Sequence, residues 1–291
     1  MTVPVRVGTA EAPDGAVLWW RADGAGPPLL CSNGIGLSTF FWRKLTEYFA
    51  ATHTVVTWDY RGHGRSPVPE HPEGVTVAQC ARDLWTVAER AGVGEAVLLG
   101  HSMGVQVSLE AYRLRPDRVR AFVPMLGAPG AIFASFTGGR AMTPVLTFLL
   151  EIASRNAALA QKALRTAAKL PGVRQAARTL RVVDPERYAG EDFEQFFEHL
   201  AGLDLRACLA LARDLFSHDA SPMLADVNVP TLVIAGERDR FLPVARSREL
   251  ASLIPGAELL VVRGGSHAAL VEQPELIALA VEKFLRQNGI A

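Results

Sequence analysis

Residues 95–104 read EAVLLGHSMG, and the apolar run AVLL is typical of a strand buried on both faces of a sheet. The next five residues, GHSMG, match the pattern G-x-S-x-G, and apolar residues with helical spacing follow them. Strand, tight turn and helix is the setting in which this pattern holds a serine in a strained, exposed position. A side chain at Gly100 or Gly104 would crowd the strand and the helix that meet there. We therefore interpret Ser102 as a nucleophile.

Strand and helix signals alternate on both sides of this stretch. Strands are predicted around Val3–Val7, Val17–Trp20, Pro28–Ser32, Thr54–Trp58, Ala96–Leu99, Val119–Leu126, Thr231–Ala235 and Glu258–Val262. Helices are predicted after Ser38, which can cap the first of them, and at Val77–Ala91, Val244–Leu253 and Pro274–Leu285. Repeated β-α units of this kind predict the α/β class, here with a mostly parallel sheet of eight strands and helices on both faces.

A helical insertion interrupts the alternation. From about Ala131 to Ala220 every usable signal is helical. We predict a core formed by residues 1–130 and 221–291, and an inserted helical cap formed by residues 131–220. The apolar faces of two cap helices either line a substrate pocket or pack on neighbouring helices. The residues concerned are Leu146, Leu149, Leu150, Phe193, Phe196 and Phe197.

The insertion is polarised in charge. Residues 140–181 carry eight Lys or Arg and one acid, whereas residues 182–226 carry ten Asp or Glu and three Arg. A basic helical surface of this kind favours contact with an anionic membrane or an anionic substrate. The alternative is that the two halves are solvated faces that pair with each other.

The composition bears on several other classes of protein. The 291 residues carry 30 basic and 30 acidic side chains, so there is no global signature of nucleic-acid binding. No window approaches ~18 consecutive apolar residues, so we expect no stable membrane insertion, and the first residues lack the pattern of a signal peptide. The three cysteines, Cys31, Cys80 and Cys208, fit no metal spacing and favour buried thiols in a reducing compartment. We expect a cytoplasmic protein with no metal or other cofactor.

A nucleophilic serine needs a nearby base, and the base needs an acid that fixes its tautomer. In sheets of this type such groups gather at the carboxyl ends of the strands. Among the seven histidines only His267 follows a late strand in this way, whereas the side chain of His101, in the turn itself, should point away from the site. Asp239, just after the strand Thr231–Ala235, is the preferred acid, and Glu237 is the alternative.

The negative charge that develops on a carbonyl oxygen during acyl transfer needs preorganised backbone donors. Met103 follows the serine and begins a helix, so its N–H is well placed. The second donor should come from the loop after the strand Pro28–Ser32. Ile35 is the best candidate in that loop, and Gly34 is the next.

Four motifs together resemble the α/β-hydrolase superfamily. They are GHSMG at 100–104, DYRGHGRS at 59–66, GERDRFLP at 236–243 and GGSHAALVEQPE at 264–275. The resemblance runs from about Val17 to the end of the chain, and the insertion corresponds to the cap of that family. It implies that Ser102, Asp239 and His267 form a catalytic triad, with Ile35 and Met103 as oxyanion donors.

The resemblance also implies that the segment 59–66 braces the loops around the site. Two departures concern the loop shape: the chain has Asn33-Gly34 where the family often has His-Gly, and Gly104-Val105 where many members have Gly-Gly. Neither departure removes a backbone N–H.

The predicted activity is hydrolysis of a small or medium apolar carboxylic ester through an acyl-enzyme. A cofactor-free perhydrolase or haloperoxidase, or a hydrolase of C–C bonds or lactones, would keep the same triad. Serine at position 102 argues against epoxide hydrolases and haloalkane dehalogenases, which resemble this fold but use an aspartate there. An alternative of a different class is a hydrolase-like receptor that binds a ligand with negligible turnover.

Overall fold

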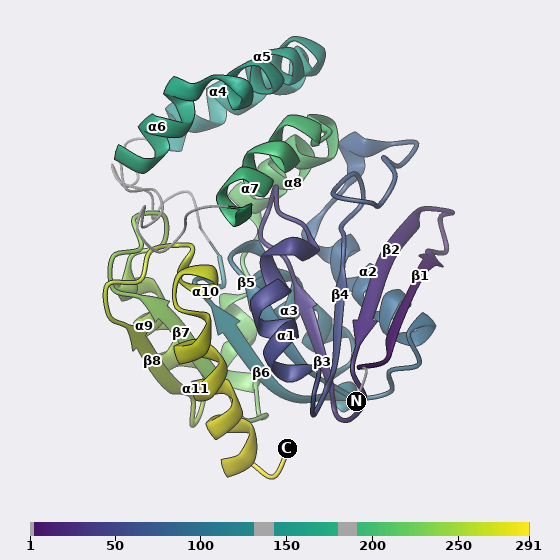
Figure 1. The fold of residues 1–291 in the computed structure, drawn as a ribbon, viewed down its shortest axis with the longest axis vertical. Helices are drawn as coiled ribbons and strands as arrows, with labels where there is room; N and C mark the ends of the chain where they lie inside the picture. Colours follow the sequence, from purple (N-terminus) through teal and green to yellow (C-terminus); the bar gives the residue numbers. More distant parts are fainter. Residues whose placement is uncertain (1–2, 131–142, 180–190, 291) are drawn as a thin grey trace.

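The computed structural model describes residues 3–130, 143–179 and 191–290, and its centre is a sheet of eight strands (Figure 1). The strands are β1 (Val5–Glu11), β2 (Val17–Asp23), β3 (Pro28–Ser32), β4 (Thr54–Trp58), β5 (Ala96–His101), β6 (Val119–Met125), β7 (Leu232–Gly236) and β8 (Glu258–Val262). Their order across the sheet is β1-β2-β4-β3-β5-β6-β7-β8. Only β1 and β2 run antiparallel to their neighbours, and the remaining pairs are parallel. The predicted α/β class and mostly parallel sheet are confirmed.

Burial explains why the central strands read as unbroken apolar runs. Every residue of β4, β5 and β7 is buried, because helices cover both faces of the parallel part of the sheet. β1 lies at the edge of the sheet and is largely exposed, including its alternating valines Val5 and Val7. The observed bounds agree with the predicted strands to within a few residues.

Two helical layers enclose the sheet. On one face lie α2 (Val77–Arg90), α3 (Met103–Leu114) and α9 (Val244–Leu253), whose buried side chains share one hydrophobic cluster. On the other face lie the 3₁₀ turn η1 (Thr39–Trp42), α1 (Arg43–Phe49), α10 (Ala269–Glu272) and α11 (Pro274–Gln287), which share a second cluster. This arrangement is a doubly wound sheet with a core on each face.

The helix after Ser38 differs from the prediction at its start. It begins as the 3₁₀ turn η1, and the Ser38 hydroxyl makes no capping bond to the helix backbone. That hydroxyl instead hydrogen-bonds the carboxylate of Asp59, which lies at the end of the neighbouring strand β4. A local capping rule missed this because a buried acid from a distant segment competes for the same hydroxyl.

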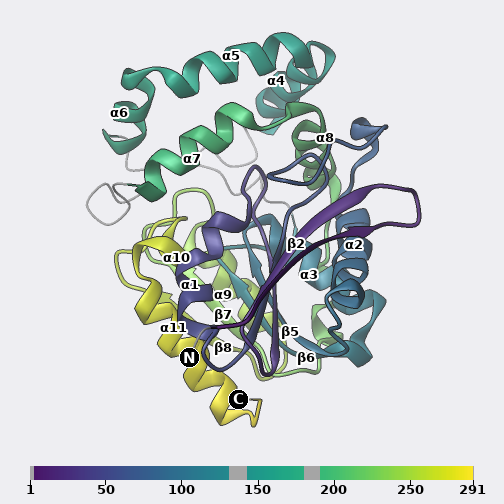
Figure 2. The same cartoon turned by 45° about the vertical axis from the view of Figure 1, so that its right-hand side comes forward.

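Among the described residues, five α-helices lie between β6 and β7 in the sequence. They are α4 (Thr143–Arg155), α5 (Ala157–Lys169), α6 (Pro171–Thr179), α7 (Glu191–Gly202) and α8 (Leu205–Ser217). Figures 1 and 2 show α7 and α8 next to the core, with α4, α5 and α6 farther from the sheet. The segment 131–142, where the predicted cap begins, lies outside the described residues, so its limits stay a prediction.

The inner cap helices meet the loops at the carboxyl ends of two strands. A Cβ placed on Gly36, after β3, would lie 3.7 Å from Leu203, which joins α7 to α8. A Cβ placed on Gly62, after β4, would lie 2.8 Å from Ala207 of α8. The helical block therefore covers the edge of the sheet where ligands of such folds bind. Among the described helices, none is both long and apolar enough to cross a membrane.

Candidate active site

Ser102 occupies a strained turn between β5 and α3. Its backbone has φ 55° and ψ −118°, a region that residues other than glycine rarely adopt. The turn is tight because two glycines let its ends approach: a Cβ on Gly100 would lie 2.4 Å from the Gly104 carbonyl oxygen. A Cβ on Gly104 would lie 2.2 Å from the Ser32 carbonyl oxygen. The predicted steric need for both glycines is confirmed.

Three side chains from the ends of different strands form one chain of hydrogen bonds. Ser102 Oγ lies 3.0 Å from His267 Nε2, and His267 Nδ1 lies 2.8 Å from Asp239 Oδ2. Because the carboxylate only accepts, Nδ1 carries the proton and Nε2 accepts from the serine hydroxyl. The second carboxylate oxygen of Asp239 accepts the backbone N–H groups of Phe241 and Leu242, each at 2.8 Å. The serine is thus linked to a base whose tautomer is fixed by a buried acid.

Glu237, the alternative acid, has a different partner. Its Oε2 accepts the backbone N–H of Gly264 at 2.8 Å, which ties the end of β7 to the turn after β8. The structure therefore brings Asp239, and not Glu237, to His267.

The loop after β3 lies against the serine. A Cβ on Gly34 would come within 3.2 Å of Ser102 Cβ, so the backbone of Gly34 and Ile35 borders the nucleophile. Met103 is the first residue of α3, where backbone N–H groups have no helical acceptor. The two predicted donors, Ile35 and Met103, therefore lie in the two backbone segments that border Ser102, where an oxyanion formed on the substrate would need hydrogen bonds.

Asn33 fixes the shape of that loop. Its Nδ2 donates to the Trp58 carbonyl at 2.6 Å, and its Oδ1 accepts the indole N–H of Trp42 at 2.8 Å. Its own carbonyl accepts the Tyr60 hydroxyl at 2.7 Å. The asparagine is fully buried, so each of these bonds would be costly to lose. Asn33, which stands where the family often has histidine, thus ties β3, β4 and η1 together.

Sequence reasoning missed the position of His101. Its Nε2 lies 3.0 Å from the backbone carbonyl of His267 and donates to it, and its ring lies 4.5 Å from that of Phe41. Burial lowers the pKa of His101 to about 3, so the imidazole is neutral. The side chain does not point away from the site but supports the backbone of the predicted base. A histidine at the last residue of a buried strand was the available signal, but the sequence does not say which loop packs against it.

The segment 59–66 holds the loops beside the site together. The Asp59 carboxylate accepts the backbone N–H groups of Thr39 and Arg65, each at 3.0 Å. The Ser66 hydroxyl donates to the Asp59 carbonyl at 2.7 Å and accepts the backbone N–H of Trp19 at 2.9 Å. Burial raises the pKa of Asp59 to about 6. These contacts join β2, β4 and η1, which fits the expected bracing role.

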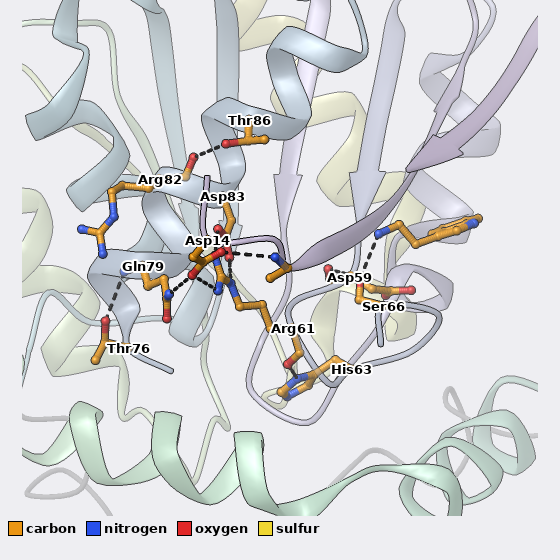
Figure 3. Close-up of polar contacts among 12 residues, drawn as sticks. Asp14, Asp59, Arg61, His63, Ser66, Thr76, Gln79, Arg82, Asp83 and Thr86 are labelled. Atoms are coloured by element: carbon orange, nitrogen blue, oxygen red, sulfur yellow. Dashed lines mark hydrogen bonds and ion pairs between the residues drawn. The ribbon is translucent and has the colours of Figure 1, made fainter. Parts of the chain in front are cut away.

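A buried arginine anchors the same segment to α2. Arg61 donates to both carboxylate oxygens of Asp83, each at 2.6 Å, and to Asp14 at 2.5 Å (Figure 3). Within the segment, His63 Nδ1 lies 3.0 Å from the Arg61 carbonyl, and burial lowers the pKa of His63 to about 4. The Arg61 guanidinium and His63 Nδ1 are therefore hydrogen-bonded within the protein, which fits a structural role for the segment.

The residues predicted to bind substrate fall into two groups. Phe193 and Phe197 of α7 are 1% and 4% exposed and belong to the cluster that includes Leu37 and Phe41, and Phe196 packs against it partly buried. Their packing joins the cap to the core beside the loop after β3, and pocket lining stays a prediction for them.

The α4 residues behave differently. Leu149 is 55% exposed on α4, which lies farther from the sheet than α7 (Figure 2), and its pocket role stays a prediction. Leu150 is partly buried, and its role stays a prediction. The side chain of Leu146 lies outside the described residues.

Two rings lie beside that of His267, and one of them, the His101 ring, is 5.1 Å away. The Phe241 ring lies 5.2 Å from the His267 ring. Within the residues that the structure describes, no group of three or more His, Cys, Asp or Glu could hold a metal ion. Cys31, Cys80 and Cys208 are free thiols.

A family model described as "alpha/beta hydrolase fold" matches residues 27–274. The chain belongs to this family. It is 30% identical over 264 residues to the "Putative carbamate hydrolase RutD" of Azorhizobium caulinodans, a match that covers 90% of this chain and 92% of the relative. The protein is therefore a hydrolase.

Solved structures agree with the fold over nearly the whole chain. A hydrolase from Pseudomonas aeruginosa has a TM-score of 0.75 and 27% identity, with 96% of this chain and 98% of that chain covered. A thermophilic esterase from Thermogutta terrifontis has a TM-score of 0.76 at 22% identity, with 97% and 99% covered. The second likeness concerns the fold alone.

Proposed function

We propose that the protein is a serine-dependent carboxylic ester hydrolase that works through an acyl-enzyme. The observation that supports this most is the hydrogen-bond chain from Ser102 Oγ through His267 to Asp239, on a serine held at φ 55°. This geometry lets the imidazole remove the hydroxyl proton as the oxygen attacks. Without such a base, a serine hydroxyl is a weak nucleophile near neutral pH.

In the proposed mechanism Ser102 Oγ attacks the ester carbonyl carbon while His267 Nε2 takes its proton. Asp239 stabilises the imidazolium, and the backbone N–H groups of Ile35 and Met103 bind the oxyanion, with Gly34 as the other loop donor. The intermediate collapses as His267 returns the proton to the leaving alcohol, which leaves an acyl group on Ser102. His267 then activates water, and the acid is released.

An apolar substrate of small or medium size is part of the proposal. Phe241 lies beside the base, and Phe193, Phe196 and Phe197 of the cap helix α7 form an aromatic group packed against the core next to the loop after β3. Such surroundings favour apolar acyl groups and lower the local dielectric, which strengthens the electrostatic contacts in the site. We propose the cytoplasm as the location, in keeping with three unpaired thiols.

Hydrolysis of a carbamate is a second candidate, favoured by the relative named a carbamate hydrolase. A carbamate presents the same carbonyl to Ser102, with an amino group in place of the acyl carbon chain. The two candidates differ in what the cap side of the site must accommodate: an apolar chain for an ester, and a small polar group for a carbamate.

The test is the initial rate of hydrolysis for p-nitrophenyl esters from acetate to palmitate, with phenyl carbamate measured in parallel. We expect ester turnover with an optimum at short or medium chains, and a fall of roughly 10⁴-fold or more in Ser102→Ala. Circular dichroism of the variant controls for folding. Faster turnover of the carbamate than of any ester would select the second candidate.

Ester hydrolysis that persists in Ser102→Ala would contradict the proposed mechanism. A single burst of product followed by a stable adduct would contradict an enzymatic role and support a receptor. Activity that requires added peroxide would point to a perhydrolase.

A further inference from the structure

The outermost cap helices expose an unusual amount of apolar surface. Among the described residues, fifteen large apolar side chains are at least about a third exposed, and six of them lie on α4–α6. These six are Phe148, Leu149, Ile152, Leu159, Leu170 and Val173. Phe148 and Leu159 are the most exposed, at 64% and 68%. Large apolar side chains exposed in this number on neighbouring helices indicate a contact with something apolar.

Cations on α5 accompany these apolar side chains. Lys162, Arg165 and Lys169 lie at positions i, i+3 and i+7 of this helix and are exposed. In the part of the chain that the structure describes, none of them has an acidic partner within ion-pair distance. The one acid of the basic half, Glu151, is paired with Arg155 at 2.8 Å. The pKa of Asp204 in the acidic half is lowered mainly by its hydrogen bond with Arg206 and also by the nearby charge of Arg165, so the pairing between the two halves reaches Arg165 only beyond ion-pair distance.

The three cations share one hollow. A hollow of about 380 Å³ along α5 is lined by Lys162, Arg165 and Lys169, with Gln161 and Thr166 beside them. Positive charges and hydrogen-bonding side chains around a shallow hollow suit a phosphate group that carries a negative charge. The helices α4 and α5, which carry four of the six exposed apolar side chains, both lie on the side of the cap away from the sheet (Figures 1 and 2).

We propose that α4–α6 form a docking surface for a membrane that contains anionic phospholipids. The cations meet the headgroup phosphates, and the exposed apolar side chains enter the boundary between headgroups and acyl chains. Charge complementarity selects this occupant: residues 143–179, which span α4–α6, carry six cations and one acid, a net charge of +5. A second copy docked through the same face would bring like charges together, and a neutral apolar partner would leave the cations unpaired.

The test is co-sedimentation of the full-length protein with vesicles at low salt. We expect binding to phosphatidylcholine and phosphatidylglycerol mixed 7:3, weak binding to phosphatidylcholine alone, and release at high salt. The variant Lys162→Glu/Arg165→Glu/Lys169→Glu should lose about 100-fold in partitioning, since each cation near the surface contributes roughly fivefold. The variant Phe148→Ser/Ile152→Ser/Leu159→Ser should lose on the order of tenfold.

The matched control reverses three exposed cations of the core. Arg82→Glu/Arg120→Glu/Lys283→Glu changes the net charge by the same amount and should keep its binding to the mixed vesicles. Unchanged melting temperatures and unchanged turnover of a short soluble ester would show that the variants are folded. Because the assay measures sedimentation, its outcome does not depend on the proposed esterase activity.

Four results would overturn the proposal. One is equal binding by the cap variant and the wild type, and another is equal loss by the core control, which would show a general charge effect. The third is displacement from vesicles by millimolar inorganic phosphate, which would assign the hollow to a soluble anion. A concentration-dependent dimer that the Phe148 variant abolishes would assign the face to a second copy and would equally contradict membrane docking.

Discussion

Gly104 decides how closely α3 approaches β3. Its backbone lies so near the end of β3 that a Cβ would sit 2.2 Å from the Ser32 carbonyl oxygen and 2.8 Å from that of Asn33. Both contacts are with backbone atoms, so no side chain can move aside. The residue therefore controls two features at once: the elbow that carries Ser102 and the start of the loop that Asn33 fixes.

We predict that Gly104→Ala loses roughly 3 kcal/mol of unfolding free energy, the upper end for overpacking a tight site. The remaining folded protein should also lose ester turnover, because the loop of Gly34 and Ile35 must shift. Urea denaturation and initial rates measure the two effects. Gly94→Ala is the control: a Cβ there meets nothing within 4 Å, so its stability and rate should stay close to wild type. Equal stability of the two variants would contradict the steric explanation.

The residues of the hydrogen-bond chain could be predicted because each lies in a short stretch of sequence with a recognisable pattern. Ser102, Asp239 and His267 each follow a recognisable strand, and parallel strands bring their carboxyl ends to one edge. The position of His101 was not predictable in this way. Which side of β5 its ring occupies, and that the backbone of His267 lies there, depends on packing between segments 166 residues apart.

At the scale of elements, one ion pair holds the loop after β4 against α2. Arg61 and Asp83 have side chains only 5% and 2% exposed, and they form two parallel hydrogen bonds. Asp14, from the turn between β1 and β2, adds a third contact to the same guanidinium. The loop that carries Asp59 and Ser66 is thereby fixed to two other elements.

We predict that Asp83→Asn destabilises the protein by about 3 kcal/mol, because it leaves a buried guanidinium with only one carboxylate partner. Asp117→Asn serves as the control, since Asp117 is fully exposed beside Arg115, and its loss should have little effect. Chemical denaturation of the three proteins measures the difference. If both variants unfold at the same denaturant concentration as wild type, the anchor is not important for stability.

Elements whose residue pattern reflects their own burial could be predicted from the sequence, and elements whose orientation depends on distant contacts could not. Strands and core helices were predictable because burial on both faces leaves continuous apolar runs, as in β4 and β5. The cap was harder. The helix α4 is apolar on most sides, so its sequence does not say which side faces the site, and Leu149, predicted to face the substrate, is 55% exposed. The orientation of α4 is set by its packing against α8 and α5, contacts between helices that periodicity alone cannot specify.

At the scale of the whole molecule, buried titratable groups give stability a dependence on pH. Burial lowers the pKa of His63 to about 4 and that of His101 to about 3, from an ordinary value of 6.5. Burial raises the pKa of Asp59 from 3.8 to about 6. These groups lie in the loops and strands around the same edge of the sheet, so acidification acts on the fold where the site is built.

The two kinds of group oppose each other. Below pH 6.5 the unfolded chain binds protons at His63 and His101 that the folded chain does not, so these residues reduce stability as the pH falls. Between pH 6 and pH 3.8 the folded chain binds a proton at Asp59 that the unfolded chain does not, so Asp59 increases stability as the pH falls. The loss of unfolding free energy from the two histidines is larger than the gain from the one aspartate. The lowered pKa values of His53 and His199, also caused by burial, act in the same direction as the histidines.

We therefore predict that the unfolding free energy falls by about 3 kcal/mol between pH 6.5 and pH 4.5, at about 1.4 kcal/mol per pH unit for each net proton. Urea denaturation at a series of pH values measures this fall. His63→Asn can keep the hydrogen bond to the Arg61 carbonyl but cannot be protonated, so its slope should be shallower by about one proton. His71→Asn, at an exposed site, should keep the wild-type slope. A slope that is the same in all three proteins would show that His63 is not among the groups that make the fold sensitive to acid.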